Sequence, residues 1–534
     1  MDAMSQSVET IMSSRPVTMG GSISFNDNLE FLPDSSSNYY CLSGSLSTKF
    51  FGVVDVPLSF SYTNNQFTKN MAMPFNRFSL SPSYKEYTVY IGFNSMTFSK
   101  YTMSGHDYFG GGAAYLPSEG ISAEAFFGRL RKAVQPDSTT SDAGYARHGG
   151  GLKIGYKTDR YEVSTNVIKI KDKDNSVSFD GYESQYVYPK DNIAASVKAD
   201  VKVTDKLSLG GEYAVSQIYE SEGKYTYHAF DCSVLYAGSV GSIGASYDRL
   251  PPNYETLGGY YFNEDEEQVA LNMTTTIASK ITLGGNFGYR HDNIEHQQIA
   301  TNKSFAYAAD LHSTPMERLA LSASINNDQS YVNLRDNLEQ LTQMSEFEDL
   351  DTNEYSRLNL SANFGANYST KPSDVLANNF NASFSYNTTS DHQRYDTASA
   401  NSKIYNLNLG TSTTFLAPKI SVGTNIGLSK TDSYSQRYKM LTLAASLSKT
   451  FAKGLALSCA YTYAATQTDT ISSAVTNLRA SANYTLFKKH SLGLSFCYIH
   501  NPMSPSMQNR YTLSFNYGYG FTIIGDKKKE EEQE

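Results

Sequence analysis

The 534-residue sequence contains no tryptophan, only 15 prolines and only 18% charged residues, with a net charge of −9. This negative balance excludes a protein that binds nucleic acid through a basic surface. Low charge combined with 13% aromatic residues excludes an intrinsically disordered chain, which would be richer in charge and poorer in aromatic rings. Because 41 tyrosines and 28 phenylalanines accompany few breakers of secondary structure, the composition is typical of a β-rich protein.

Long apolar runs and cysteine motifs are also missing. No segment approaches the roughly 18 to 20 apolar residues of a membrane-spanning helix, which excludes helical membrane proteins. Residues 1–21 lack the basic and apolar regions of a secretory signal peptide, so either the protein is not exported or the numbering begins after a removed signal. The cysteines are far apart and form no Cys-x-x-Cys pair, and the sequence carries no cofactor signature.

A two-residue period runs through the sequence and is clearest in its second half. Between Ala474 and Leu486 the even positions are mostly apolar, whereas the odd positions include Asn477, Arg479 and Asn483. The period recurs at 358–368, 380–386, 492–498 and 511–519. Because successive side chains of a strand point to opposite faces, this pattern predicts repeated strands with one apolar and one polar face.

The connections between these predicted strands alternate in length. Tight turns such as 157–161 and 416–420 are separated by connections that are usually longer and more polar, at 171–189, 251–266, 292–302, 329–352 and 388–398. Short turns at one end and long loops at the other are typical of an outer-membrane barrel, and a soluble sandwich has no reason to segregate them. The sequence therefore predicts an all-β protein: a single closed antiparallel transmembrane β-barrel with short periplasmic turns and long extracellular loops.

The predicted barrel has about 26 strands, within a range of 22 to 26. Seven early strands are expected near 17–28, 38–51, 55–63, 75–82, 86–93, 109–117 and 121–132, and roughly 19 follow between 144 and 525. Residues 1–16 then form an N-terminal periplasmic segment, 17–525 the barrel, and 526–534 a charged periplasmic tail. The first strand must pair with the last, because an open sheet edge is costly in a bilayer.

A barrel of this width is too large for its own side chains to fill. The residues predicted to line the lumen are mostly neutral hydrogen-bonding groups: Asn359, Ser361, Asn363, Asn367, Asn381, Asn406, Asn408, Asn477, Arg479, Asn483 and Asn516. Such a lining would select solutes by size and hydrogen bonding, with little ion preference.

Two segments could narrow this lumen. In segment 94–108, Tyr101, Ser104, His106 and Asp107 are candidates for a constriction. In segment 329–352 the three- and four-residue spacing of Leu334, Leu338, Leu341 and Met344 predicts a short amphipathic helix that covers the barrel mouth, forms a gate or docks a partner.

Enzymatic and metal sites have weaker support in the sequence. Ser104, His106 and Asp107 are the residue types of a hydrolase triad, but neighbours on an extended chain point to opposite faces and cannot form the relay among themselves. The histidines lack zinc-ligand spacing, and the acidic run at 264–267 lacks the pattern of a calcium loop. We therefore expect neither an enzyme nor a metal site.

Three tripeptides match an acidic-hydroxyl-apolar pattern used for bacterial O-glycosylation. They place candidate acceptor hydroxyls at Ser138, Thr397 and Thr470, all in predicted external loops.

Segment 74–134 carries a series of motifs: Phe75 to Lys85, Ser95 to His106, Gly110 to Gly112 and Gly128 to Val134. Together they resemble the N-terminal part of large outer-membrane β-barrel proteins of the Bacteroidota, over about a ninth of the chain. The resemblance implies a bacterial outer-membrane location, in contact with membrane lipid and lipopolysaccharide, and brings no established activity. No plug domain or energy-coupling box is recognised before the first strand, so we expect a barrel nearly alone.

Two functional hypotheses follow. The first is a wide, neutral-polar, loop-gated channel for polar solutes or glycans. The alternative is a barrel that serves as a subunit or platform of an envelope complex for protein or lipid export or assembly, with envelope proteins as partners. An exposed apolar patch shared by several loops would favour the alternative.

Overall fold

The structure, a computed structural model, describes residues 15–64, 76–137, 143–220, 223–259, 265–296, 301–333, 355–371, 373–393, 401–433, 437–451, 454–502 and 508–524. Nearly all of these residues belong to strands. In chain order the strands are β1 (Val17–Phe31), β2 (Ser36–Phe50), β3 (Val54–Thr63), β4 (Arg77–Leu80), β5 (Ser83–Tyr84), β6 (Tyr87–Thr97), β7 (Ser104–Tyr115), β8 (Gly120–Arg131), β9 (Arg147–Lys157), β10 (Tyr161–Asp172), β11 (Asp191–Lys202), β12 (Leu207–Glu220), β13 (Gly223–Ala237), β14 (Gly241–Leu250), β15 (Glu266–Ile277), β16 (Ile281–His291), β17 (Thr301–Met316), β18 (Leu319–Asn333), β19 (Tyr355–Ser369), β20 (Leu376–Gln393), β21 (Ser402–Phe415), β22 (Ile420–Ser433), β23 (Arg437–Thr450), β24 (Leu455–Thr468), β25 (Ser472–Leu486), β26 (His490–His500) and β27 (Asn509–Ile524).

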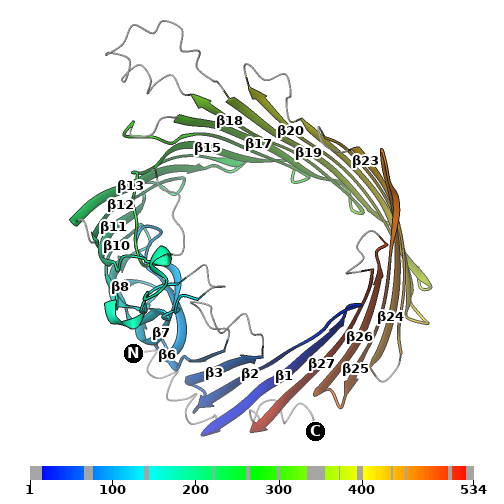
Figure 1. The fold of residues 1–534 in the computed structure, drawn as a ribbon, viewed down its shortest axis with the longest axis horizontal. Coiled ribbons are helices and arrows are strands. Elements are labelled where there is room, and N and C mark those ends of the chain that lie inside the picture. Colours follow the sequence, from blue (N-terminus) through cyan, green and yellow to red (C-terminus); the bar gives the residue numbers. More distant parts are fainter. Residues whose placement is uncertain are drawn as a thin grey trace, which may run out of the picture.

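The strands form one closed antiparallel barrel, which Figure 1 shows end-on as a ring. β4 and β5 both pair with β3 on one side and with β6 on the other, so they are two parts of a single interrupted strand. The 27 labelled strands therefore occupy 26 positions in the wall. β1 pairs with β27 from Phe31 opposite Tyr511 to Met19 opposite Ile524, which closes the ring. The predicted barrel, its strand number and its closure are confirmed.

Connection length is segregated between the two barrel ends. At the end where β1 begins and β27 finishes, every turn between strands spans two to six residues. At the opposite end the long connections are 64–76, 132–146, 173–190, 251–265 and 334–354. A few connections at this second end are also short, at 32–35, 221–222, 434–436 and 469–471. We call the two ends the turn end and the loop end.

Helical structure is confined to two single turns in the described part of the chain. The 3-10 turns Asp174–Ser176 and Glu183–Gln185 both lie in the 173–190 connection. Within the described ranges, no helix is long and apolar enough to cross a membrane.

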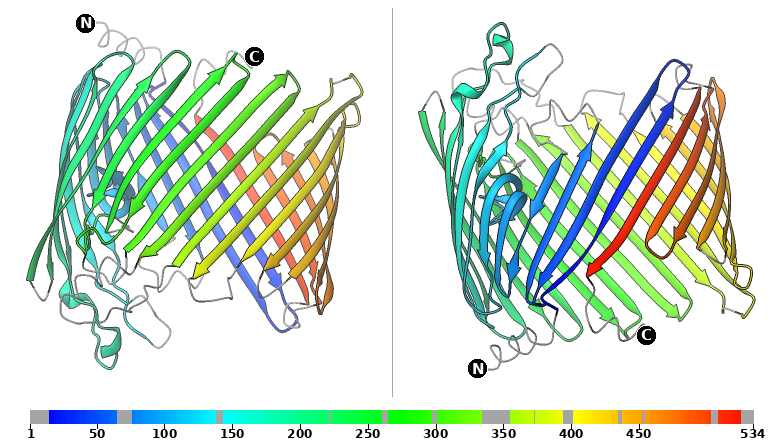
Figure 2. Two further views of the ribbon diagram at one scale, coloured as in Figure 1. Left: turned by 90° about the horizontal axis from the view of Figure 1, so that it is seen from above. Right: turned by 90° about the horizontal axis from the view of Figure 1, so that it is seen from below.

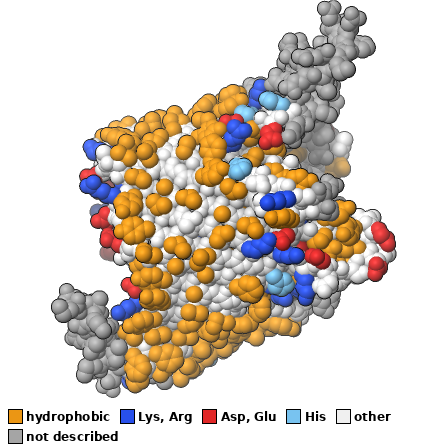
Figure 3. Space-filling model, turned by 90° about the vertical axis from the view of Figure 1, so that its left-hand side faces the viewer, with side chains coloured by type: hydrophobic (Ala, Val, Ile, Leu, Met, Phe, Trp, Pro, Cys, Tyr) orange, Lys and Arg blue, Asp and Glu red, His pale blue; other side chains and the backbone are white. Residues whose placement is uncertain are grey.

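The outer wall is apolar over most of its height. The tilted strands in Figure 2 form this wall, and Figure 3 shows one side of it, where hydrophobic side chains spread across the middle and charged side chains gather toward the two ends. Outward-facing residues of β10 and β11 are accordingly large and exposed, as with Val167 at 44% and Val197 at 54%. An exposed apolar surface of this extent requires a nonaqueous surrounding or a partner.

Candidate functional site: two loops held against the inner wall

The two faces of the wall are related through the strand register. On β10, Asn166, Ile168 and Ile170 are buried, whereas the alternating Val167 is exposed on the outer wall. Residues directly opposite one another in a ladder share a face. The register from β10 to β27 therefore assigns one inner face to the whole wall, which includes Asn166 on β10 and Asp248 on β14.

All eleven residues predicted to line the lumen lie on this inner face. Some of them form hydrogen-bonded rows across neighbouring strands. Asn406 Nδ2 donates to Ser385 Oγ at 3.1 Å, and Ser429 Oγ donates to Asn406 Oδ1 at 2.7 Å. Asn359 belongs to a hollow of about 470 Å³ between β16 and β20, which also includes Asn326 and Asn387. The wall thus presents amide and hydroxyl groups inward.

Two connections at the loop end cover part of the inner face, on the side of the barrel formed by β6 to β14. The first is residues 98–103, between β6 and β7, and the second is residues 251–259, which belong to the connection between β14 and β15. They pair at a bridge between Met103 and Gly258, and Ser104 N donates to Gly258 O at 3.1 Å. A Cβ at position 258 would lie 2.3 Å from the carbonyl oxygen of Thr102, so this close approach of two backbones requires glycine.

Apolar side chains fill the space between the first loop and the wall. Phe98 and Met103 pack with Leu257 from the second loop against Ile168 and Ile170 of β10. The glycines of β9 make room for them, since a Cβ on Gly151 would lie 2.8 Å from the Phe98 ring. This side of the barrel therefore has a packed hydrophobic core on its inner face, whereas the rows around Asn406 do not.

Asn192 of β11 connects the second loop to the wall and is completely buried. Its Nδ2 donates to Ser216 Oγ at 2.8 Å and to the Gln217 carbonyl at 3.1 Å. Its Oδ1 accepts from Leu257 N at 3.1 Å and from Thr256 Oγ1 at 3.4 Å. Ser216 Oγ in turn donates to the Glu255 carbonyl at 2.5 Å. One amide side chain of β11 thus satisfies groups from the neighbouring strand β12 and from the second loop.

Charged side chains hold the first loop at its edge. Lys100 pairs with Asp231 at 3.1 Å and with Asp248, and the Tyr101 hydroxyl donates to Asp248 at 3.0 Å. Burial alone would lower the pKa of Lys100, but the hydrogen bonds and negative charges of Asp248 and Asp231 outweigh it and raise that pKa. Burial, aided by the same two carboxylates, raises the pKa of Tyr101. Lys100 is therefore positively charged, and Tyr101 is a neutral hydrogen-bond donor, at physiological pH.

The structure separates the residues predicted to form a constriction. Tyr101 is on the first loop, with its ring against Tyr254 and the backbone carbonyl of Tyr101 accepting from the Tyr254 hydroxyl at 2.8 Å. Ser104, His106 and Asp107 belong to β7, so their assignment to a loop was wrong. The loop comprises only residues 98–103, because β6 continues to Thr97 and β7 already begins at Ser104. Within β7, Gly105 adopts a positive φ of 61°, close to a shift in the register between β6 and β7.

Ser104, His106 and Asp107 make separate contacts. His106 is buried and its Nδ1 lies 2.7 Å from the backbone oxygen of Asp107, whereas the Asp107 carboxylate pairs with Arg77 at 2.6 Å. A Ser-His-Asp relay needs the carboxylate on the imidazole. The Asp107 carboxylate is instead in an ion pair with Arg77. Within the described ranges no three His, Cys, Asp or Glu side chains are grouped as they would be around a metal ion.

Several other predicted positions fall outside the described residues. These are Leu334, Leu338, Leu341 and Met344 of the predicted gate, and the acceptor hydroxyls Ser138 and Thr397. Thr470 is described and lies exposed in the short connection between β24 and β25. Its modification remains a prediction.

The second loop was missed as an inner-wall element, since 251–266 was expected only as an external connection. Its sequence, PPNYETLGGYYFNEDE, does carry a signal. Tyr254, Leu257 and Gly258 are unusual in a polar loop, and two of these three residues are large and apolar enough to require burial.

No protein-family model matches the sequence, and no curated protein matches it. Solved structures of low identity do match. The translocation pore of the P pilus usher PapC aligns with a TM-score of 0.36 and 10% identity, over 95% of this chain and 100% of that chain. The FrpB iron transporter from Neisseria meningitidis aligns with a TM-score of 0.40 and 12% identity, over 96% and 84%. An anion-selective porin from Comamonas acidovorans aligns with a TM-score of 0.28 and 11% identity, over 59% and 89%. The barrel assignment rests on the strand pairing within this chain.

Proposed function

We propose that the barrel spans the bacterial outer membrane and forms a wide channel for neutral polar solutes, with glycans as the favoured class. One observation carries this proposal: the wall is closed, apolar on its outer face and lined by amides and hydroxyls on its inner face. This arrangement is the inverse of a water-soluble barrel and suits a lipid exterior with a wet interior. The resemblance of segment 74–134 to Bacteroidota barrels supports the same location.

The outer face also carries aromatic side chains near strand ends. On the outer face of β27, Tyr511 lies near one end of the strand, and Phe515, Tyr517 and Tyr519 follow one another toward the other end. The rings of Tyr498 and Tyr511 stack with their centres 4.9 Å apart. Tyrosine is favoured at membrane–water interfaces because its ring is apolar and its hydroxyl is polar. With no tryptophan in the chain, tyrosine takes this position alone.

Ion selectivity should be weak because charges on the inner face neutralise one another. Four close pairs illustrate this: Lys49 with Asp55 at 3.0 Å, Lys198 with Asp200 at 3.1 Å, Arg357 with Asp391 at 3.6 Å, and Arg510 with Glu30 at 2.5 Å. A pore lined by opposite charges in close pairs and by neutral amides exerts little net field on a passing ion. Amide and hydroxyl rows instead match the hydroxyl groups of sugars, which both donate and accept hydrogen bonds.

Single-channel recording of the purified full-length protein in planar bilayers tests this proposal. We expect steady conductance, with a potassium-to-chloride permeability ratio within about a factor of two of unity. Swelling of proteoliposomes in neutral sugars of increasing size should show a size limit, and charged sugars of matched size should enter at similar rates.

Stable insertion without any current, with or without residues 332–350, would overturn the channel and favour the platform in an envelope complex. A strongly cation- or anion-selective current would overturn the neutral-solute assignment while leaving the channel.

A further inference from the structure

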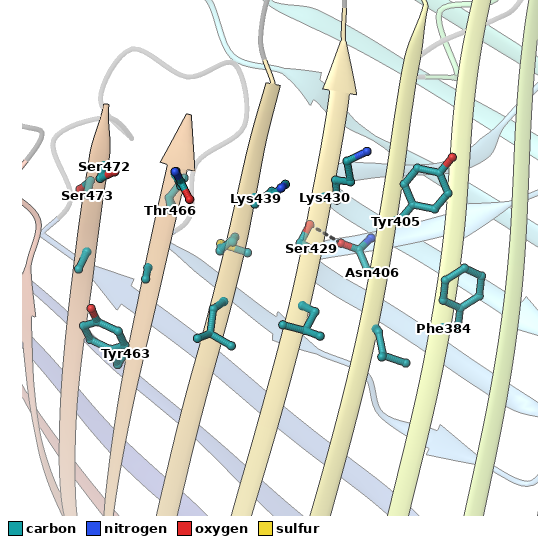
Figure 4. Close-up of a pocket in the computed structure, with 17 residues that line it drawn as sticks. Phe384, Tyr405, Asn406, Ser429, Lys430, Lys439, Tyr463, Thr466, Ser472 and Ser473 are labelled. Carbon is teal, nitrogen blue, oxygen red and sulfur yellow. Dashed lines mark hydrogen bonds between the residues drawn. The ribbon is translucent and has the colours of Figure 1, made fainter. Parts of the chain in front are cut away.

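A groove of about 720 Å³ lies on the outer face of the wall, across strands β20 to β25. Figure 4 shows the side chains that line it, with Lys430 and Lys439 on neighbouring strands at one end of the groove. Most of the lining belongs to the outer face by register, for example Phe384, Leu428 and Tyr463. The groove therefore opens away from the lumen, toward the surroundings of the barrel.

The groove has a polar end and an apolar end. Lys430 lies three residues before the end of β22, and Lys439 lies two residues after the start of β23, so both are near the loop end of the barrel. Toward the middle of the wall the lining becomes Leu428 and Leu441, which are directly opposite one another. A molecule with a charged head and an acyl chain matches this sequence of surfaces.

The two lysines are directly opposite in the ladder between β22 and β23. Like charges in directly opposed positions destabilise a sheet unless an anion lies between or beside them. Asp432 supplies one anion, with its carboxylate 2.5 Å from Lys430 Nζ, and the Lys430 ammonium also lies 6.0 Å from the centre of the Tyr405 ring. Among the described residues, no ion-pair partner is found for Lys439.

Two further cations surround the same carboxylate. Lys403 on β21 and Arg437 on β23 are the register partners of Asp432 on its two sides. In the described part of these strands, four positive groups near the loop end of the outer face are accompanied by one aspartate, which leaves a surplus of three positive charges. Charge-assisted hydrogen bonds from lysine and arginine to phosphate oxygens are among the strong polar interactions of proteins.

We propose that this groove binds a phosphorylated acyl lipid, the lipid A portion of lipopolysaccharide, with a phosphate between Lys430 and Lys439 and an acyl chain along Leu428 and Leu441. The assignment to lipid A rests on the proposed outer-membrane location, in which the loop end faces the outer leaflet. Tyr405, opposite Lys430, then lies beside the phosphate, and Tyr463, opposite Leu443, lies beside the acyl chain.

Native mass spectrometry of the delipidated full-length protein with added lipid A tests the proposal. We expect the double variant Lys430→Gln/Lys439→Gln to bind lipid A at least about tenfold more weakly than the unaltered protein, because two charge-assisted contacts are lost. The matched control is Lys449→Gln/Lys489→Gln, which removes two cations at the turn end and should bind lipid A as the unaltered protein does. Dephosphorylated lipid A, phosphatidylglycerol and inorganic phosphate are the comparison ligands, and all three should bind weakly.

Equal lipid A binding by the double variant and its control would overturn the site. Dephosphorylated lipid A that binds as well as lipid A would overturn the role of the phosphate, and tight binding of phosphatidylglycerol or free phosphate would overturn the identity of the lipid. Conductance and liposome flotation are measured on the same samples, so that loss of lipid A binding in a protein that still inserts and conducts is distinguished from failure of the proposed channel.

Discussion

Replacing Asn192 with leucine is expected to release the loop 251–259 from the inner wall and to lower the free energy of unfolding by about 2–3 kcal/mol. Leucine has a similar size but neither donates nor accepts hydrogen bonds, so Leu257 N and Ser216 Oγ lose their contacts with residue 192. A buried polar group without a partner destabilises the fold by more than the lost hydrogen bond, because the group has also lost its hydrogen bonds to water. Urea unfolding in detergent, followed by the heat-modifiable gel mobility of the barrel, measures the change.

Single-channel recording of the same variant provides a second readout. A loop freed from the wall should add current fluctuations that the unaltered channel lacks, because its segment 254–258 can then move in the lumen. Asn408→Leu is the matched control, since Asn408 also lies on the inner face but on β21, away from both loops. Unchanged stability together with unchanged current noise in Asn192→Leu would contradict the assigned role of Asn192 in holding the loop.

The contrast between Asn192 and Asn408 illustrates what the sequence could and could not reveal. Both asparagines occupy polar positions in an alternating strand pattern, which is sufficient to predict an inward-facing residue. That Asn192 also binds Leu257, 65 positions later, depends on loop closure, which a local period does not encode. The alternating pattern therefore predicted the strands of the wall and their inward faces. It did not predict which loops lie against the inner wall, because that depends on contacts between distant segments.

Gly105 explains the main error in the predicted strand bounds. Around Gly105 the sequence combines Ser, Gly, His and Asp, which is typical of a loop, and the loop was expected to extend to residue 108. In the structure Gly105 has a φ of 61°, and the ladder between β6 and β7 shifts register at Met96 and Thr97. A glycine inside a strand often marks such a bulge, so the strand continues through it and places His106 and Asp107 in the wall.

Most of the early strands were predicted close to their observed bounds. β1 to β3 and β8 lie within a few residues of their expected bounds, because tight turns with glycine or proline separate them. The interruption between β4 and β5 falls at Ser81 and Pro82, where proline cannot donate to the ladder. Turn chemistry and strand period together were sufficient here.

Two neighbouring residues of β22 distinguish a lipid-facing outer wall from a wet inner wall. Ile426 lies near the middle of the strand on the outer face and is 46% exposed, whereas Asn425 lies on the inner face. If the outer wall contacts lipid, Ile426→Arg places a charge in the hydrocarbon and should lower the free energy of unfolding from the bilayer by about 2–4 kcal/mol. Asn425→Arg adds the same charge to the wet face, so its effect on stability should be within about 0.5 kcal/mol. Its visible effect should instead be a shift of the reversal potential toward anion preference, because one uncompensated cation now lines the pore.

Urea titration of folding into liposomes measures the stability of both variants, and bilayer recording under a salt gradient measures the reversal potential. Equal stabilities for the two variants would contradict the assignment of inner and outer faces, and with it both the channel and the lipid A groove.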